Sequence, residues 1–118
     1  MKIPGPDHPI TIAPTGRPVQ VLAGEQEIAR TDEALTLAEA SYPPAHYLPR
    51  EAADMSKLQR SSDRTYCPYK GEAAYFHIVT SDMRIENAVW SYEDPYPAVA
   101  EIKGRLAFYP DRTRIVVG

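Results

Sequence analysis

Prolines restrict the fold of this chain more than any other feature of its sequence. The 118 residues include twelve prolines, spread from Pro4 to Pro110. Because a proline inside a helix removes a hydrogen bond and clashes with the preceding turn, at a cost of about 3 kcal/mol, long helices have little room. Eight tyrosines and the β-branched residues favour pleated strands instead. The sequence therefore predicts a mostly β domain of antiparallel sheets and hairpins with one short helix at residues 97–103, which Gly104 can cap.

The length predicts a single domain, since domains cluster at about 100–150 residues. Residues 1–16 hold prolines at positions 4, 6, 9 and 14 and predict an extended arm with at most a short strand at 10–12. Residues 17–118 are expected to form the β domain.

Alternation of apolar and polar residues predicts most of the strands. A hairpin at 19–30 is expected to continue into a third strand at 34–38 as a meander, and strands 73–80 and 84–92 are expected to pair as a second hairpin. The other expectations are a short strand at 46–49, a helical turn or strand at 52–58, a loop at 61–63, and closing strands at 106–109 and 113–117.

Charge and motifs argue against several classes of protein. Thirteen basic and sixteen acidic side chains give a net charge of −3, so no nucleic-acid partner is expected. No apolar run reaches the roughly 18 residues of a membrane span, and the proline-rich start is unlike a signal peptide, so we expect a soluble, cytoplasmic protein without a membrane partner. Cys67 is the single cysteine, and the sequence motifs of P-loops, dinucleotide-binding turns, nucleophile elbows and zinc helices are missing. No metal and no cofactor are expected.

Three segments read together are more specific than any of these motifs. They are YLPRE at 47–51, TYCPYKGEA at 65–73 and ENAVWSY at 86–92, followed by Pro95 and by LAFY at 106–109. From about residue 18 to residue 111 the chain resembles domain-of-unknown-function family 427 (DUF427). The resemblance implies a fold similar to that of the β-tent proteins, which are small domains of coiled antiparallel sheets, and it brings a nucleotidyltransferase-like label.

Two features of the sequence depart from what this resemblance implies. Several β-tent relatives hold a structural zinc with two cysteine pairs, which Cys67 alone cannot provide. The nucleotidyltransferase label would call for a Gly-Ser nucleotide loop and a pair of metal-binding aspartates, and the sequence has neither.

Two cations within the family-like segments are candidate anion ligands. Arg50 follows a proline that fixes its backbone, and its planar fork suits a carboxylate or phosphate. The alternative is an internal salt bridge from Arg50 to Glu86, Asp54 or Asp63. Lys70 precedes Gly71 in a turn that can form an anion-binding nest, or it is simply solvated.

Aromatic and nucleophilic residues complete the candidate site. Tyr75 and His77 share one strand face by the period of two, as do Glu86, Ala88, Trp90 and Tyr92 on the next strand, so an aromatic wall is expected where the two faces meet. Trp90 as a core residue is the alternative. Cys67, with help from Lys70 or His77, and Glu86 are the candidate catalytic residues, although Cys67 also fits a small buried apolar position.

Two classes of function follow from these residues. The first is a pocket that binds, or acts on, a small anionic molecule through Tyr47, Arg50, Lys70, Tyr75 and Trp90. The second is a non-catalytic protein-interaction module that recruits its partner through an exposed edge strand. The nucleotidyltransferase activity of the family label is a third interpretation. The sequence leaves open whether the protein is an enzyme and whether it forms a homodimer.

Overall fold

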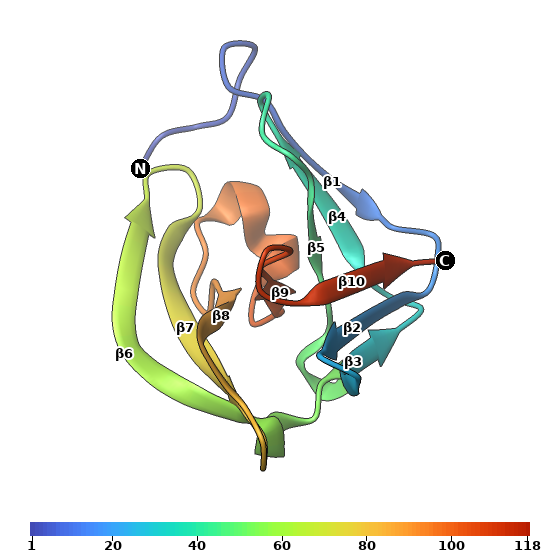
Figure 1. Cartoon of the computed structure of the whole chain (residues 1–118). Helices are drawn as coiled ribbons and strands as arrows, with labels where there is room; N and C mark the ends of the chain where they lie inside the picture. Colours follow the sequence, from blue (N-terminus) through green and yellow to red (C-terminus); the bar gives the residue numbers. More distant parts are fainter.

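Three small antiparallel sheets make up the computed structural model, which describes all 118 residues. Sheet 1 contains, in spatial order, β1 (Ile10–Pro14), β4 (Leu35–Glu39) and β5 (Ala45–Tyr47). Sheet 2 contains β10 (Arg114–Val117), β2 (Val19–Ala23) and β3 (Gln26–Thr31). Sheet 3 contains β6 (Leu58–Cys67), β7 (Gly71–Val79), β8 (Arg84–Ser91) and β9 (Ala107–Phe108). The sheets stand on three sides of a common interior (Figure 1). The predicted mostly β fold is confirmed.

Helical structure is limited to three short 3-10 segments, η1 (Arg50–Ala52), η2 (Met55–Lys57) and η3 (Pro97–Ile102). The predicted helix near residue 97 is therefore present, but Val99 has φ −124° and ψ 30° and interrupts its regular turns. Residues 52–58, for which turn and strand were both open, form the end of η1, all of η2 and the start of β6. No helix in the structure has the length and apolar character needed to cross a bilayer.

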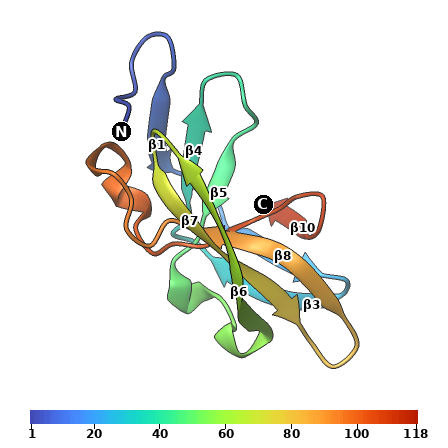
Figure 2. The same ribbon diagram turned by 90° about the vertical axis from the view of Figure 1, so that its left-hand side faces the viewer.

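The predicted meander at the start of the chain is wrong. The β2–β3 hairpin forms, but β4 pairs with β1 and β5 in sheet 1 instead of continuing sheet 2. The outer edge of β3 is occupied by the segment after η1, where Ala29 bridges Ala53 and the Asp54 N–H donates to the Ile28 carbonyl. The strand within residues 1–16 extends to Pro14, and β1 projects with the β4–β5 hairpin to one end of the molecule (Figure 2).

Two irregularities in sheet 3 change which way its side chains point. The register of β6 with β7 shifts between Arg60 and Arg64, so the loop expected at 61–63 is a bulge inside a continuous strand. The register of β7 with β8 shifts between Phe76 and Ile78, and Asn87 in the bulging segment of β8 has φ 49°. A bulge inserts extra residues and reorients the side chains beyond it. The expected common face of residues 86, 88, 90 and 92 is therefore broken.

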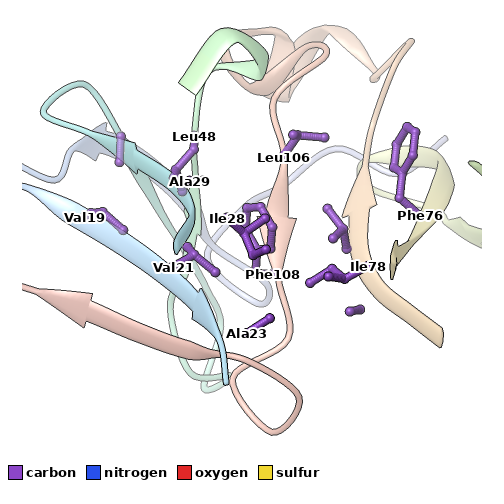
Figure 3. Packing of buried hydrophobic residues seen from close by; sticks show 13 residues of the cluster. Val19, Val21, Ala23, Ile28, Ala29, Leu48, Phe76, Ile78, Leu106 and Phe108 are labelled. Carbon is purple, nitrogen blue, oxygen red and sulfur yellow. The ribbon is translucent and has the colours of Figure 1, made fainter. Parts of the chain in front are cut away.

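The apolar core forms two clusters. A cluster of 13 buried residues joins β2 and β3 to β7, β8 and β9, and it includes Val21, Ile28, Ile78 and Phe108 (Figure 3). A second cluster packs η3 against sheets 1 and 3 and consists of Leu37, Tyr47, Ala73, Tyr92, Val99, Ile102 and Ala107. The second cluster borders the cavity described next.

Candidate functional site

A cavity of about 740 Å³ opens between sheet 1, sheet 3 and the segment that runs from β9 to β10. Its wall is formed by Leu37, Glu39, Tyr42, Pro43, Pro44, Ala45, His46, Tyr47, Lys70, Tyr75, Trp90, Tyr92, Phe108, Tyr109, Pro110, Ile115 and Val117. Four of these side chains, Leu37, Tyr47, Tyr92 and Phe108, also belong to the core clusters. The wall of the cavity is therefore partly made of the residues that hold the sheets together.

Aromatic rings dominate one side of the cavity, and strand register places them there. Trp90 of β8 lies directly opposite Tyr75 of β7, and its ring centroid is 4.5 Å from that of Tyr109. The Trp90 indole N–H donates to the Tyr47 hydroxyl over 3.0 Å, with the two rings edge to face at 6.1 Å. This contact fixes the indole between sheet 3 and sheet 1. The expected aromatic wall thus contains Tyr47, Tyr75 and Trp90.

Three phenols of the wall stay neutral. Burial raises the pKa of Tyr47, Tyr92 and Tyr109 well above the ordinary value of 10.0. No hydrogen bond joins the Tyr92 hydroxyl to another protein group, and the Lys70 ammonium lies over the Tyr92 ring, 5.8 Å from its centroid. The Tyr47 oxygen accepts a hydrogen bond from Trp90, which leaves its own proton free to donate. Both residues line the cavity, and neither hydroxyl proton has an acceptor within the protein.

An ion pair forms the polar end of the cavity. Lys70, in the turn between β6 and β7, donates to Glu39 Oε1 at the end of β4, and both side chains are nearly buried, at 11% and 12% exposed. His8 Nε2 lies 2.6 Å from Glu39 Oε2, and the His8 ring stacks on the Tyr69 ring with a distance of 4.0 Å between centroids. Burial alone would raise the pKa of Glu39, but the hydrogen bonds from Lys70 and His8 outweigh it and lower the pKa below 4.5. Glu39 is therefore ionised at neutral pH.

His46 also lines the cavity, on β5. Burial lowers its pKa below the ordinary value of 6.5, so the ring is neutral at physiological pH. Its Nδ1 lies 3.0 Å from the Thr36 hydroxyl, which itself lies 2.8 Å from the Thr15 hydroxyl. This chain of contacts holds the imidazole on the wall.

Arg50 lies outside the cavity. Its Nε donates to the Gly104 carbonyl and its Nη2 to the Ser91 hydroxyl, each over 3.0 Å, and Nη2 is 3.1 Å from a carboxylate oxygen of Glu93. The internal salt bridge foreseen as an alternative is therefore present, but its partner is Glu93. The structure does not bring Arg50 and Lys70 together on one concave surface, because each is held by its own carboxylate on a different part of the fold.

The candidate catalytic residues do not form a reactive pair. Cys67 is half-buried against the second core cluster and is not part of the cavity wall. Glu86 is exposed and pairs with Arg84 at 3.2 Å. His77 is buried in β7, where its Nδ1 accepts the Asn87 backbone N–H over 3.0 Å. Of the seven candidate site residues, Tyr47, Lys70, Tyr75 and Trp90 line the cavity.

Sequence reasoning missed Glu39, His46, Tyr42, Phe108 and Tyr109 as wall residues. Glu39 was one of several acidic residues near the β2–β3 hairpin, and nothing local distinguishes it from its solvated neighbours. Tyr109 and Phe108 stand within the LAFY segment, which was the available signal for them. No group of three or more His, Cys, Asp or Glu side chains in the structure is arranged to hold a metal ion.

The comparison with protein families agrees with the resemblance seen in the sequence. The model of the family described as "Domain of unknown function (DUF427)", labelled NTP_transf_9, matches residues 11–118. No curated protein matches the chain. The matched range runs from β1 to β10 and includes every residue of the cavity wall. The chain therefore belongs to the DUF427 family.

Proposed function

We propose that this domain binds a small planar molecule in the cavity between its three sheets. The observation that carries the proposal is the combination of an aromatic wall with an unpaired hydroxyl, that of Tyr92. Small-molecule sites are typically concave, about 300–1,000 Å³ in volume, mainly apolar, and supplied with a few oriented polar groups. The cavity, at about 740 Å³, fits this description.

The rings favour a flat ligand. Trp90 and Tyr109 present faces and edges that can stack on an aromatic body. This cavity gives no support to the anionic ligand expected from the sequence, because Arg50 lies outside it and Lys70 is already paired with Glu39. Nucleotidyl transfer gains none either, since Glu39 is the only carboxylate on the wall and it is engaged by Lys70 and His8.

A thermal-shift screen of planar compounds tests the proposal, because a ligand that binds the native state raises the melting temperature by mass action. The cavity can be filled by Ala45→Trp, since Ala45 lines it from β5. The matched control is Ala13→Trp, at an exposed position of the same sheet. Compounds that stabilise the wild type should still stabilise Ala13→Trp and should lose their effect on Ala45→Trp. Stabilisation that survives in Ala45→Trp, or a screen without any stabilising compound, would contradict the proposal.

A protein-interaction module is the second candidate, and the outer edge of β10 supports it. This strand pairs only with β2, and Val116 and Val117 are each 38% exposed. An unpaired apolar edge can accept a strand from another chain, including a second copy of this one. Ile115 and Val117 face the cavity and Val116 alternates away from it. Sedimentation velocity should detect association that Val116→Lys abolishes while ligand-induced stabilisation remains.

A further inference from the structure

The charges on the cavity wall determine which ligands it accepts. We propose that the cavity selects uncharged planar molecules over anions, an inference that rests on the proposed function. Glu39 is the specificity-determining residue, because it neutralises Lys70. Lys70 is the only lysine or arginine on the wall. Whether it can bind an anion decides the charge of the ligand.

The Lys70 ammonium is occupied. It contacts Glu39 Oε1 in a setting where both side chains are nearly shielded from solvent. A ligand carboxylate brought to Lys70 would also approach the Glu39 carboxylate, so attraction and repulsion would largely cancel. The carboxylate would still lose its hydration on entering the cavity, which is costly for a charge without a partner of its own.

The other groups of the wall add no positive charge. His46 is neutral because burial lowers its pKa. The faces of the Trp90, Tyr75 and Tyr109 rings carry the negative side of the aromatic quadrupole, which repels an anion placed over them. A cation would be accepted over the rings but would meet Lys70 at the polar end. An uncharged ligand is repelled neither by the ring faces nor by Lys70.

The free hydroxyls specify what the uncharged ligand should carry. The Tyr92 hydroxyl has no hydrogen-bond partner within the protein, and the Tyr47 proton is not used by the contact with Trp90. Both can donate to a carbonyl, an ether or a ring nitrogen. The ligand class is therefore an uncharged, planar ring compound with a hydrogen-bond acceptor.

Three naphthalene probes separate charge from shape. 2-Naphthamide and 2-naphthoate have nearly the same size, and 2-naphthylmethylamine supplies the cation. Isothermal titration of the wild-type protein should give an affinity for 2-naphthamide at least about tenfold higher than for either charged probe. If 2-naphthoate or the amine binds as tightly as the amide, the selectivity is refuted while the binding function stands. If none of the three binds, the proposed function itself fails.

Two variants test the role of the ion pair. Glu39→Gln frees Lys70, so the ratio of the affinity for 2-naphthoate to that for 2-naphthamide should rise at least about tenfold. Lys70→Gln leaves the Glu39 charge in excess and should raise the affinity for 2-naphthylmethylamine instead. The control is Glu72→Gln, which removes the same charge from an exposed pair with Arg64 and should change none of the affinities. An unchanged affinity ratio in folded Glu39→Gln, or unchanged affinity for the amine in folded Lys70→Gln, would overturn the assignment.

Discussion

The indole N–H of Trp90 and the hydroxyl of Tyr47, 3.0 Å apart, form a hydrogen bond that joins sheet 3 to sheet 1. The two residues are 43 positions apart in the chain, and each belongs to one of the family-like segments. The bond fixes the position of the largest ring of the cavity wall. It is therefore a structural contact and a means of shaping the binding site.

The Trp90–Tyr47 bond should appear as an energetic coupling. Trp90→Phe and Tyr47→Phe each keep a ring and remove one partner of the bond, so each should lower the free energy of unfolding by about 1 kcal/mol, apart from packing changes. The double variant should lose less free energy of unfolding than the sum of the losses in the two single variants. Urea denaturation of the four proteins measures the coupling, and strict additivity would show that the bond contributes nothing.

Arg50 should matter for stability and not for ligand binding. Arg50→Ala removes three polar contacts, to Gly104, Ser91 and Glu93, and the contact of the guanidinium with the Phe76 ring. It also leaves the fully buried Ser91 hydroxyl without its donor. We expect a loss of about 2 kcal/mol in the free energy of unfolding and unchanged ligand affinity. Arg30→Ala, which breaks an exposed pair with Glu27, should cost less than about 1 kcal/mol. If folded Arg50→Ala binds ligand more weakly than the wild type, Arg50 takes part in ligand binding and this prediction is wrong.

Acid should weaken the contact at the polar end of the cavity. Because the folded pKa of Glu39 is lowered below its ordinary value of 4.5, its contribution to stability is present above that pH and is lost as the pH falls through the folded pKa. The stability difference between wild type and Glu39→Gln should therefore be largest near neutral pH and shrink in acid. Chemical denaturation at a series of pH values from neutral to acidic measures it. A difference that is constant with pH would show that the charge of Glu39 is not what stabilises the contact.

The bulge in β8 should tolerate glycine better than alanine. Asn87 has φ 49°, a left-handed conformation that favours glycine and asparagine over other residues. Both Asn87→Ala and Asn87→Gly lose the 2.6 Å hydrogen bond to Asp63, but only alanine adds backbone strain. Asn87→Ala should therefore be roughly 1 kcal/mol less stable than Asn87→Gly in thermal or chemical denaturation. Equal stabilities would show that the bulge relaxes to another conformation.

Local patterns in the sequence were enough to predict most of the strands, but not β6, in which a loop was expected at 61–63. Alternation and turn residues gave the β2–β3 and β7–β8 hairpins, and proline spacing excluded long helices. Pairings between distant segments were not predictable, because β1 with β4 and β10 with β2 depend on which sheet edges remain free after the chain has folded. The same limit explains why β4 was wrongly expected to continue the β2–β3 hairpin. The polar residues 31–33 that precede β4 resemble an ordinary hairpin turn.

The candidate site was predictable where residues meet across a hairpin and not where they meet across sheets. Tyr75 and Trp90 were placed together correctly because their strands are consecutive. Glu39 and Lys70 are 31 residues apart in the sequence, and Arg50 and Glu93 are 43 residues apart. No local sequence pattern therefore indicates either pairing. The β8 bulge also turned Glu86 out to solvent, which a strict period of two cannot anticipate.

Phe108, Leu37, Tyr47 and Tyr92 serve the core and the cavity wall at once. In many proteins the residues that choose a ligand sit on loops, where they can be exchanged freely. Here a substitution that reshapes the cavity also removes packing between sheets, so a new ligand preference would need a compensating change in the interior. Divergence among such domains should therefore proceed by paired substitutions, with recognition and folding altered together.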